Sequence, residues 1–327
     1  MRRFCHAILS LTFLCGFALS CKAASKQEEA DALMKQAAAL SLFQANDAPP
    51  FRLRLHLKLA GMRSGSVEGN YSWASNAHGQ WRQELTFADF VQLQGGSADR
   101  QWQKRSVDFE PKPSAWVLNL VNNLHRLTIR PDEELEKINR EGPLRCLEFR
   151  AGSDGRRSVC FDKDGLLTSV MLSDPDTVYE YSNYTSLAEK RFPRSLRVTW
   201  NGRHVVDAEL QELTSDRDIS DDTFVAPPGA IERASCWSPQ GGHLLKKVQP
   251  LYPITARDQY QTGSVTLYIE ITKDGTVRNP QVIQTAGLVL NDAALTAVKQ
   301  WQFAPYMCGN TPIEMEDEVT VIFSLLL

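Results

Sequence analysis

Apolar and polar side chains alternate with a period of two in a segment that begins at Phe51. From residue 51 to 59, the odd positions hold phenylalanine or leucine and the even positions hold arginine, histidine or lysine. Such alternation is typical of a β-strand with one buried and one solvent-exposed face. Weaker versions of the pattern follow, separated by turns rich in Gly, Asp and Asn. They predict strands over residues 66–75, 79–87, 90–95, 101–106, 144–149, 157–162, 166–172, 177–184, 194–200 and 203–213.

Three segments of the same region have a helical period instead. Residues 25–45 are rich in alanine and keep their apolar positions on one face until two prolines end the pattern. Residues 113–124 predict a second helix and residues 131–140 a third. The glutamates of the third are expected on its solvated surface: Glu133, Glu134 and Glu136. Many short strands with few helices predict one antiparallel, meander-like sheet over residues 25–214.

The last quarter of the chain shows a different order of elements. They are a strand over residues 264–272, a turn at Asp274-Gly275, a return strand over 277–284, a helix over 292–301 and an apolar strand over 318–327. An Asp-Gly pair readily adopts the positive φ of a type I′ hairpin turn. Asn291 is the expected N-cap of the helix. The order predicts a compact ββαβ domain.

A stretch between these two regions, residues 215–242, has the composition of a linker. It contains several aspartates and a Pro-Pro-Gly sequence. The aspartates lack the spacing of a calcium-binding EF-hand loop, so we expect a solvated loop. The sequence therefore predicts a β-rich domain over residues 25–214, a linker over 215–242 and a C-terminal domain over 243–327.

The N-terminus has the pattern of an export signal. A short basic start precedes an apolar run, residues 7–19, which as a helix would span only ~20 Å, whereas a bilayer core is ~30 Å thick. We expect residues 1–23 to be a signal peptide and the protein to be located in the periplasm or cell envelope. Three alternatives stay open: cleavage after Ala23 or Ala24, cleavage before Cys21 with lipidation of its thiol, and retention of the run as a membrane anchor.

Composition narrows the classes of function. The 327 residues are 43% hydrophobic, and 36 basic residues face 39 acidic ones, for a net charge of -3. This balance provides no basic surface for nucleic acid, and a single apolar run excludes a multi-spanning membrane protein. The common motifs of nucleophilic, metal-dependent and nucleotide-dependent catalysis do not occur in the sequence. We therefore expect no enzyme activity, no cofactor and no metal site.

Four of the seven cysteines follow the predicted signal peptide: Cys146, Cys160, Cys236 and Cys308. An even number of cysteines in an exported chain suggests disulfides. Cys146 and Cys160 flank a predicted hairpin, and a register centred near Ser153 would place them opposite each other, where a bond can form. Cys236 and Cys308 would then pair by elimination. The alternative is that the four are free, buried thiols.

The C-terminal region resembles the C-terminal domain of the TonB family. Each match alone is common, but the ordered set extends over about 85 residues. The matches are Gln249-Pro250-x-Tyr252-Pro253, Ala256-Arg257, Gly263-x-Val265, Asp274-Gly275-x-Val277, Ala294-Leu295 with Ala297-Val298, Trp301-x-Phe303-x-Pro305 and the last apolar strand.

The resemblance implies an interaction module that acts in the periplasm. Domains of this family pair an exposed strand edge with a short segment, the Ton box, of an outer-membrane TonB-dependent transporter. The positions that would contact the partner strand here are Gln249, Tyr252, Pro253, Val319, Thr320, Val321, Ile322, Phe323, Ser324 and Leu325. Tyr252 and Pro253 have an alternative, structural role, in which the ring packs on the core and the proline sets the entry into the next helix. An unpaired apolar edge also predicts a homodimer when no other partner is bound.

Family members that transduce energy contact a proton-driven motor in the inner membrane through an uncleaved helix, and they carry a long Pro-rich spacer. In this chain the apolar run is short, and a domain of about 200 residues occupies the place of the spacer. The motor complex is therefore a conditional partner, which depends on retention of the N-terminal run.

Residues 25–235 resemble, in layout, the lipoprotein carriers of the LolA and LolB type, which have a leading helix and then a long strand meander. This resemblance implies a curved antiparallel sheet with helices on its concave side. The expected fold class is α+β, with that N-terminal domain followed by the ββαβ domain. The alternative function is an envelope carrier or scaffold, whose first domain binds a lipid and whose second domain is a docking or dimerising module. Four tryptophans are candidates to line the lipid cavity, unless they pack as ordinary sheet residues: Trp73, Trp81, Trp102 and Trp116.

Overall fold

The computed structural model describes residues 26–41, 48–60, 65–97, 100–125, 127–130, 133–151, 155–172, 177–233, 236 and 239–325. The expected signal peptide and the lipidation candidate Cys21 lie outside these residues. The chain forms two compact units: unit 1 comprises residues up to 98 and 102–231, and unit 2 comprises residues 99–101 and 232–327. Among the helices of the described residues, none combines the length and the apolarity that a membrane span requires.

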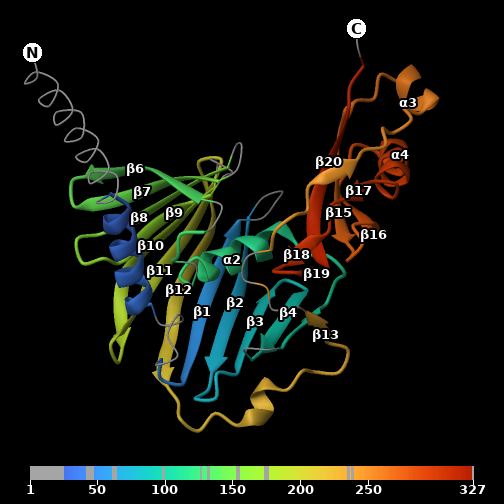
Figure 1. Cartoon of the computed structure of the whole chain (residues 1–327). Helices are drawn as coiled ribbons and strands as arrows, with labels where there is room; N and C mark the ends of the chain where they lie inside the picture. The colour runs from blue at the N-terminus through green and yellow to red at the C-terminus, as the bar shows by residue number, and fades with distance from the viewer. Residues whose placement is uncertain are drawn as a thin grey trace, which may run out of the picture. The chain divides into compact units, whose positions relative to one another are not determined.

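Unit 1 is built on a large antiparallel sheet, which is curved and not closed (Figure 1). Within the described residues the strand order is β13-β5-β4-β3-β2-β1-β12-β11-β10-β9-β8-β7-β6. The strands are β1 (Phe51–Ala60), β2 (Ser66–Ser75), β3 (Trp81–Phe87), β4 (Phe90–Gly96), β5 (Gln101–Arg105), β6 (Glu133–Glu141), β7 (Leu144–Ala151), β8 (Gly155–Phe161), β9 (Leu167–Met171), β10 (Thr177–Leu187), β11 (Lys190–Trp200), β12 (Arg203–Ser215) and β13 (Ile231–Arg233). The predicted antiparallel sheet is thus confirmed.

Strand β1 joins two meanders. It pairs with β2 on one side and, from Phe51 opposite Ser215 to Leu59 opposite Val206, with β12 on the other. Its odd residues are buried and its even residues are exposed along the whole strand. The alternation in the sequence therefore has its expected cause, because one face of β1 lies in the core and the other faces solvent.

Two helices lie across the inner face of this sheet, namely residues 26–40 and α2 (Lys112–Asn122) (Figure 1). Val117, Leu120 and Val121 of α2 are buried in the core of unit 1. The Tyr181 hydroxyl donates a hydrogen bond of 2.8 Å to the carbonyl oxygen of Leu120. At the end of the first helix, Lys190 Nζ donates to the carbonyl oxygen of Ala39 at 3.1 Å, which satisfies a carbonyl that the helix leaves unpaired.

The prediction of a helix over residues 131–140 is wrong. Residues Glu133–Glu141 form strand β6, which pairs with β7. The three glutamates do not share a solvated helix surface. The side chain of Glu133 is fully buried against Arg157 of β8, whose Nη2 lies 2.6 Å from Glu133 Oε2. Pairing with a distant strand and with a buried cation outweighs the weak local preference for helix.

The first part of the expected linker packs on unit 1. Arg52 Nε lies 2.6 Å from Asp216 Oδ2. Ile219 and Phe224, the latter in a short 3₁₀ helix η1 (Asp221–Phe224), form a small buried cluster with Ala74. Arg82 Nη1 donates to the carbonyl oxygen of Thr223 at 3.2 Å. These contacts hold residues 216–224 against the outer face of β1, β2 and β3.

Unit 2 contains a three-stranded antiparallel sheet with the order β16-β15-β20. Its elements in chain order are β14 (Leu244–Lys246), α3 (Ile254–Asp258), β15 (Gly263–Ile271), β16 (Val277–Gln284), α4 (Leu288–Val298), β17 (Gln302–Phe303), β18 (Tyr306–Cys308), β19 (Thr311–Ile313) and β20 (Met315–Phe323). The core lies between the sheet and α4, where Val265, Leu267 and Ile269 meet Ala294 and Val298.

Helix α4 begins one turn earlier than expected. Its N-cap is Gly287, which has a φ of 108°, a conformation open to glycine at low cost. The expected N-cap Asn291 lies within the first turn, where it is buried and its Oδ1 accepts the backbone N–H of Ala286 at 3.3 Å. The side chain therefore caps the preceding loop and not the helix.

Candidate functional site

One edge of the sheet in unit 2 is open among the described residues. Strand β20 pairs with β15, from Met315 opposite Ile271 to Phe323 opposite Gly263, and β20 is the last strand of the sheet on that side. Val321 and Phe323 point into the core, whereas Ile322 is 71% exposed. An edge strand presents unpaired backbone N–H and C=O groups, which can bind an added strand.

The predicted partner-strand residues fall into two groups. The first comprises residues of β20, namely Val319, Thr320, Val321, Ile322 and Phe323, which share the open edge. Ser324 and Leu325 follow the end of the strand, which begins and ends earlier than predicted.

The second group lies in the extended segment Val248–Pro253, which we call the strap. The Tyr252 ring packs edge-on against Phe323 with 5.5 Å between the ring centroids, and its hydroxyl donates to the carbonyl oxygen of Gln261. Pro253 is the N-cap of α3. Trp301 Nε1 donates to the carbonyl oxygen of Val248 at 2.9 Å. These contacts match the structural alternative for Tyr252 and Pro253, and they fasten the strap beside the end of β20.

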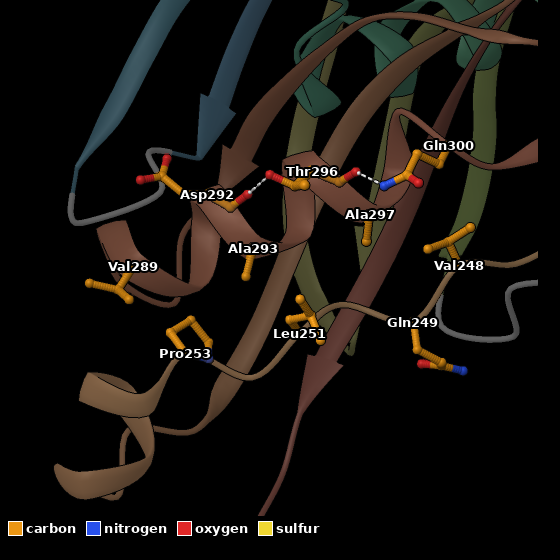
Figure 2. Close-up of a pocket in the computed structure, with 10 residues that line it drawn as sticks. All are labelled: Val248, Gln249, Leu251, Pro253, Val289, Asp292, Ala293, Thr296, Ala297 and Gln300. Carbon is orange, nitrogen blue, oxygen red and sulfur yellow. Dashed lines mark hydrogen bonds between the residues drawn. The ribbon is translucent and has the colours of Figure 1, made fainter.

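A groove of about 670 Å³ lies between the strap and helix α4 (Figure 2). Its lining is mostly apolar and carries a single ionisable group. The lining residues are Val248, Gln249, Leu251, Pro253, Val289, Asp292, Ala293, Thr296, Ala297 and Gln300. Figure 2 shows Ala293 and Ala297 directed from α4 toward the strap, with Leu251 facing them. Gln249, which the TonB resemblance places beside a bound peptide, is exposed at this groove.

Large apolar side chains are exposed around the groove. Leu251 of the strap is 89% exposed and Ile254 at the start of α3 is 73% exposed. Leu288 and Val289, in the first turn of α4, are 82% and 41% exposed. Clusters of exposed aliphatic side chains around a hollow are typical of binding surfaces. The sequence prediction missed this surface, although Leu288 and Val289 lie just before the expected helix.

The segment before the strap, residues 236 and 239–242, is attached to strand β18. Cys236 and Cys308 form a disulfide, and Gln240 and Met307 exchange backbone hydrogen bonds of 2.9 and 2.7 Å. Gly242 has a φ of 75°, and its Cα lies so close to the Tyr306 ring that a Cβ atom would clash with it. The strap is thus held at one end by this segment and at the other by α3.

Two charged groups lie in the sheet that carries the open edge. Arg278 of β16 contacts Glu270 of β15 through Nε at 2.7 Å and Glu314, just before β20, through Nη2 at 2.8 Å. These contacts raise the pKa of Arg278. Asp317 of β20 accepts a hydrogen bond of 3.4 Å from the Tyr306 hydroxyl. Burial raises the pKa of the Asp317 carboxyl, and the pKa of Tyr306 rises to about 12 because of burial and the nearby carboxylate.

In unit 1, the structure joins Cys146 and Cys160 in a disulfide, opposite each other in the β7–β8 hairpin, as the predicted register requires. The tryptophans proposed for a lipid cavity do not all lie on the same face of the sheet. Trp73 stacks on His125 with 4.5 Å between the ring centroids, and Trp116 packs beside Trp200 at 5.6 Å. Trp102 covers Gly95 on the opposite face of the sheet from Trp73. Trp102 therefore does not line a cavity shared with Trp73.

No cluster of His, Cys, Asp and Glu side chains suited to a metal ion occurs among the described residues. The chemistry that unit 2 offers is binding: an open strand edge with main-chain hydrogen-bonding groups, and an apolar groove behind the strap.

Comparison with known proteins identifies the C-terminal region. Residues 248–325 match the family model for the C-terminal domain of the Gram-negative bacterial TonB protein. The TonB protein of Vibrio cholerae is 31% identical over 80 residues, which cover 24% of this chain and 33% of that protein. The chain thus spans about a third of the length of this relative.

Solved structures that are similar to part of this chain include two bacterial proteins. A LolA superfamily protein from Nitrosomonas europaea has 10% identity and a TM-score of 0.40, and covers 60% of this chain and 97% of its own. A putative outer membrane lipoprotein-sorting protein domain from Vibrio parahaemolyticus has 11% identity and a TM-score of 0.42, and covers 60% of this chain and 96% of its own. The ordered motifs of the sequence and the family match agree that residues 248–325 are similar to a TonB C-terminal domain.

Proposed function

We propose that unit 2 is a docking module of the bacterial cell envelope that binds an extended segment of an outer-membrane transporter along the open edge of β20. In this role the protein takes part in energised transport by binding and has no catalytic activity of its own. The match of residues 248–325 to the TonB C-terminal family model supports the class of partner. The observation that carries the mode of binding is that β20 pairs only with β15 among the described residues.

Main-chain pairing would supply the affinity and the exposed side chains of the edge would supply selectivity. Ile322, which is 71% exposed, is well placed to contact alternate side chains of an added strand. The core side chains Val321 and Phe323 are buried, so they hold β20 in place whether or not a partner is present. An edge that is fixed in advance reduces the entropy lost on binding.

The test measures binding of synthetic peptides, copied from the periplasmic N-terminal segments of outer-membrane transporters of the same bacterium, to the full chain by calorimetry. For each peptide that binds, two matched versions carry N-methyl groups on alternate backbone amides. A strand added to β20 directs only one of the two sets of amides toward the protein, so one version should lose binding and the other should keep it. Equal binding of both versions would contradict strand addition, and no binding by any peptide would contradict the proposed partner.

A pair of chain variants locates the site. Ile322→Lys should weaken binding, because it alters the exposed face of the edge strand. Leu245→Lys is the control, since Leu245 is 60% exposed in β14, which pairs with β17 and not with β20. Equal effects of the two substitutions would place the peptide elsewhere.

A further inference from the structure

The groove between the strap and α4 is a second surface of unit 2, and its lining includes no residue of β20. We propose that this face joins two copies of the chain, with α4 packed antiparallel on α4 of the second copy around a two-fold axis near Thr296. The proposal is independent of strand addition at β20, because it uses a different set of residues.

Charge complementarity along α4 supports a second copy as the occupant. Asp292 and Lys299 are exposed on the same side of the helix, seven positions apart, which is about two turns or 10 Å along the axis. In an antiparallel pair centred near Thr296, each Asp292 faces Lys299 of the other copy. Both charges then have partners in an interface that is otherwise uncharged along its lining. A two-fold axis repeats every such contact and closes the assembly as a dimer.

The centre of the helix can be buried without leaving polar groups unpaired. The Thr296 hydroxyl donates to the carbonyl oxygen of Asp292 at 2.8 Å, and Gln300 Nε2 donates to the carbonyl oxygen of Thr296 at 2.9 Å (Figure 2). These bonds within the helix satisfy side chains that would otherwise need water. Ala293 is small and partly exposed, so it leaves room for a second helix beside Thr296.

The exposed aliphatic residues supply the apolar part of the interface. Leu251 projects from the strap, 89% exposed, beside the hollow that faces Ala293 and Ala297. When two copies meet face to face, their hollows join, and the two Leu251 side chains are available to fill the combined space. Leu288 and Val289 would be covered by the far end of the second α4, because the helices run in opposite directions.

The first test is analytical ultracentrifugation of the full chain over a wide range of concentrations, with reversal of each charge. Asp292→Lys and Lys299→Asp should each weaken self-association roughly tenfold or more, because each turns two attractive pairs into repulsive ones. A mixture of the two variants should associate, since every 292–299 contact then has opposite charges. If the substitutions only weakened the helix within each monomer, mixing the two variants would not restore association. The mixture therefore distinguishes an effect at the interface from an effect on helix stability.

The second test needs no loss of association. Under mild oxidation Thr296→Cys should form a disulfide between two copies, because residue 296 lies next to the axis. Gln284→Cys, an exposed position on β16, is the control and should remain uncrosslinked. A chain that stays monomeric at every concentration would overturn the proposal. So would a dimer indifferent to both charge reversals, which would point to self-association at the open edge of β20. Crosslinking that is equal at positions 284 and 296 would also overturn it, and would direct attention to a peptide or lipid as the occupant of the groove.

Discussion

The buried ion pair between Glu133 and Arg157 gives a sharp test of how unit 1 is stabilised. Arg157 Nη2 lies 2.6 Å from Glu133 Oε2, and the two side chains are 5% and 0% exposed. Arg157 Nη2 also donates to the carbonyl oxygen of Thr128 at 2.8 Å, and its guanidinium lies 5.1 Å from the centroid of the Phe149 ring. We consider the substitution Glu133→Gln, which keeps the shape of the side chain and removes its charge.

The expected loss follows from the charge that remains behind. Two unit charges about 4 Å apart attract by about 4 kcal/mol at an effective dielectric constant of 20. Removing one partner of a buried pair typically costs about 3–5 kcal/mol, because the other charge stays buried without compensation. Arg157→Met should cost less than Glu133→Gln, since Arg130 Nε lies 3.6 Å from Glu133 Oε1 and still opposes the carboxylate. Replacing the pair by Glu133→Leu and Arg157→Met together should change stability by no more than about 1 kcal/mol.

The assay is urea unfolding of the full chain followed by tryptophan fluorescence. This signal reports mainly unit 1, which holds five of the seven tryptophans. Glu134→Gln is the matched control, because Glu134 is the exposed neighbour on the same strand and should change the free energy of unfolding by less than about 0.5 kcal/mol. The reasoning is refuted if Glu133→Gln behaves like this control, or if the double variant loses the sum of the two single losses.

Three further perturbations address unit 2. Replacing Cys236 and Cys308 together by alanine should lower its free energy of unfolding by about 4 kcal/mol, the chain-entropy value for a separation of 72 residues; an unchanged urea midpoint would argue against a role for this bridge. Gly242→Ala should destabilise the protein by more than about 2 kcal/mol, because Gly242 has a φ of 75° and the new Cβ would also meet the neighbouring tyrosine ring. The control Gly229→Ala, with a φ of 79° and open space around it, should lose only about 1 kcal/mol. Thermal unfolding of both variants measures the two losses. Burial raises the pKa of Asp317 in the folded state, so its contribution to stability falls as the pH rises from its pKa in the unfolded chain through its pKa in the folded protein. Asp317→Asn should therefore be more stable than the parent at neutral pH, and this advantage should shrink in acid. Unfolding curves at a series of pH values measure the difference.

Much of the sheet in unit 1 is predictable because its strands keep one face in the core. The prediction for residues 66–75 coincides with β2, and those for β3, β4 and β5 differ by two residues or fewer at either end. Strand β6 is the exception. Most of its side chains are partly or fully exposed to solvent, as expected for an edge strand. In the sequence, Glu133 looks like a residue on the solvent-exposed face of a helix, although its side chain is buried in the structure. Only the distant Arg157 explains that burial, and a local pattern contains no information about it.

The site of unit 2 is predictable in part. The ordered motifs predict the domain, and the apolar terminal strand predicts β20 as a candidate edge. The groove is a different case, because it forms where the strap meets a helix about forty residues later in the chain. The Asp-Gly turn shows a smaller limit of the same kind. Gly275 has a φ of 80° while Asp274 does not have a positive φ, so the turn is not the expected type I′. Its conformation is set by hydrogen bonds with Thr272 and by the close approach of Phe303.

The position of β1 between β2 and β12 has a consequence for how the protein folds during and after its synthesis. Phe51 lies opposite Ser215, so the central ribbon of unit 1 receives its second neighbour only after most of that unit has been synthesised. Until then, a long strand with a full row of leucines has an incomplete ladder, which is the state most open to wrong pairing between nascent chains. Maturation of unit 1 should therefore be slow and strongly dependent on chaperones, whereas unit 2, whose β15 and β16 are joined by a tight turn, can assemble rapidly once its own last strand emerges.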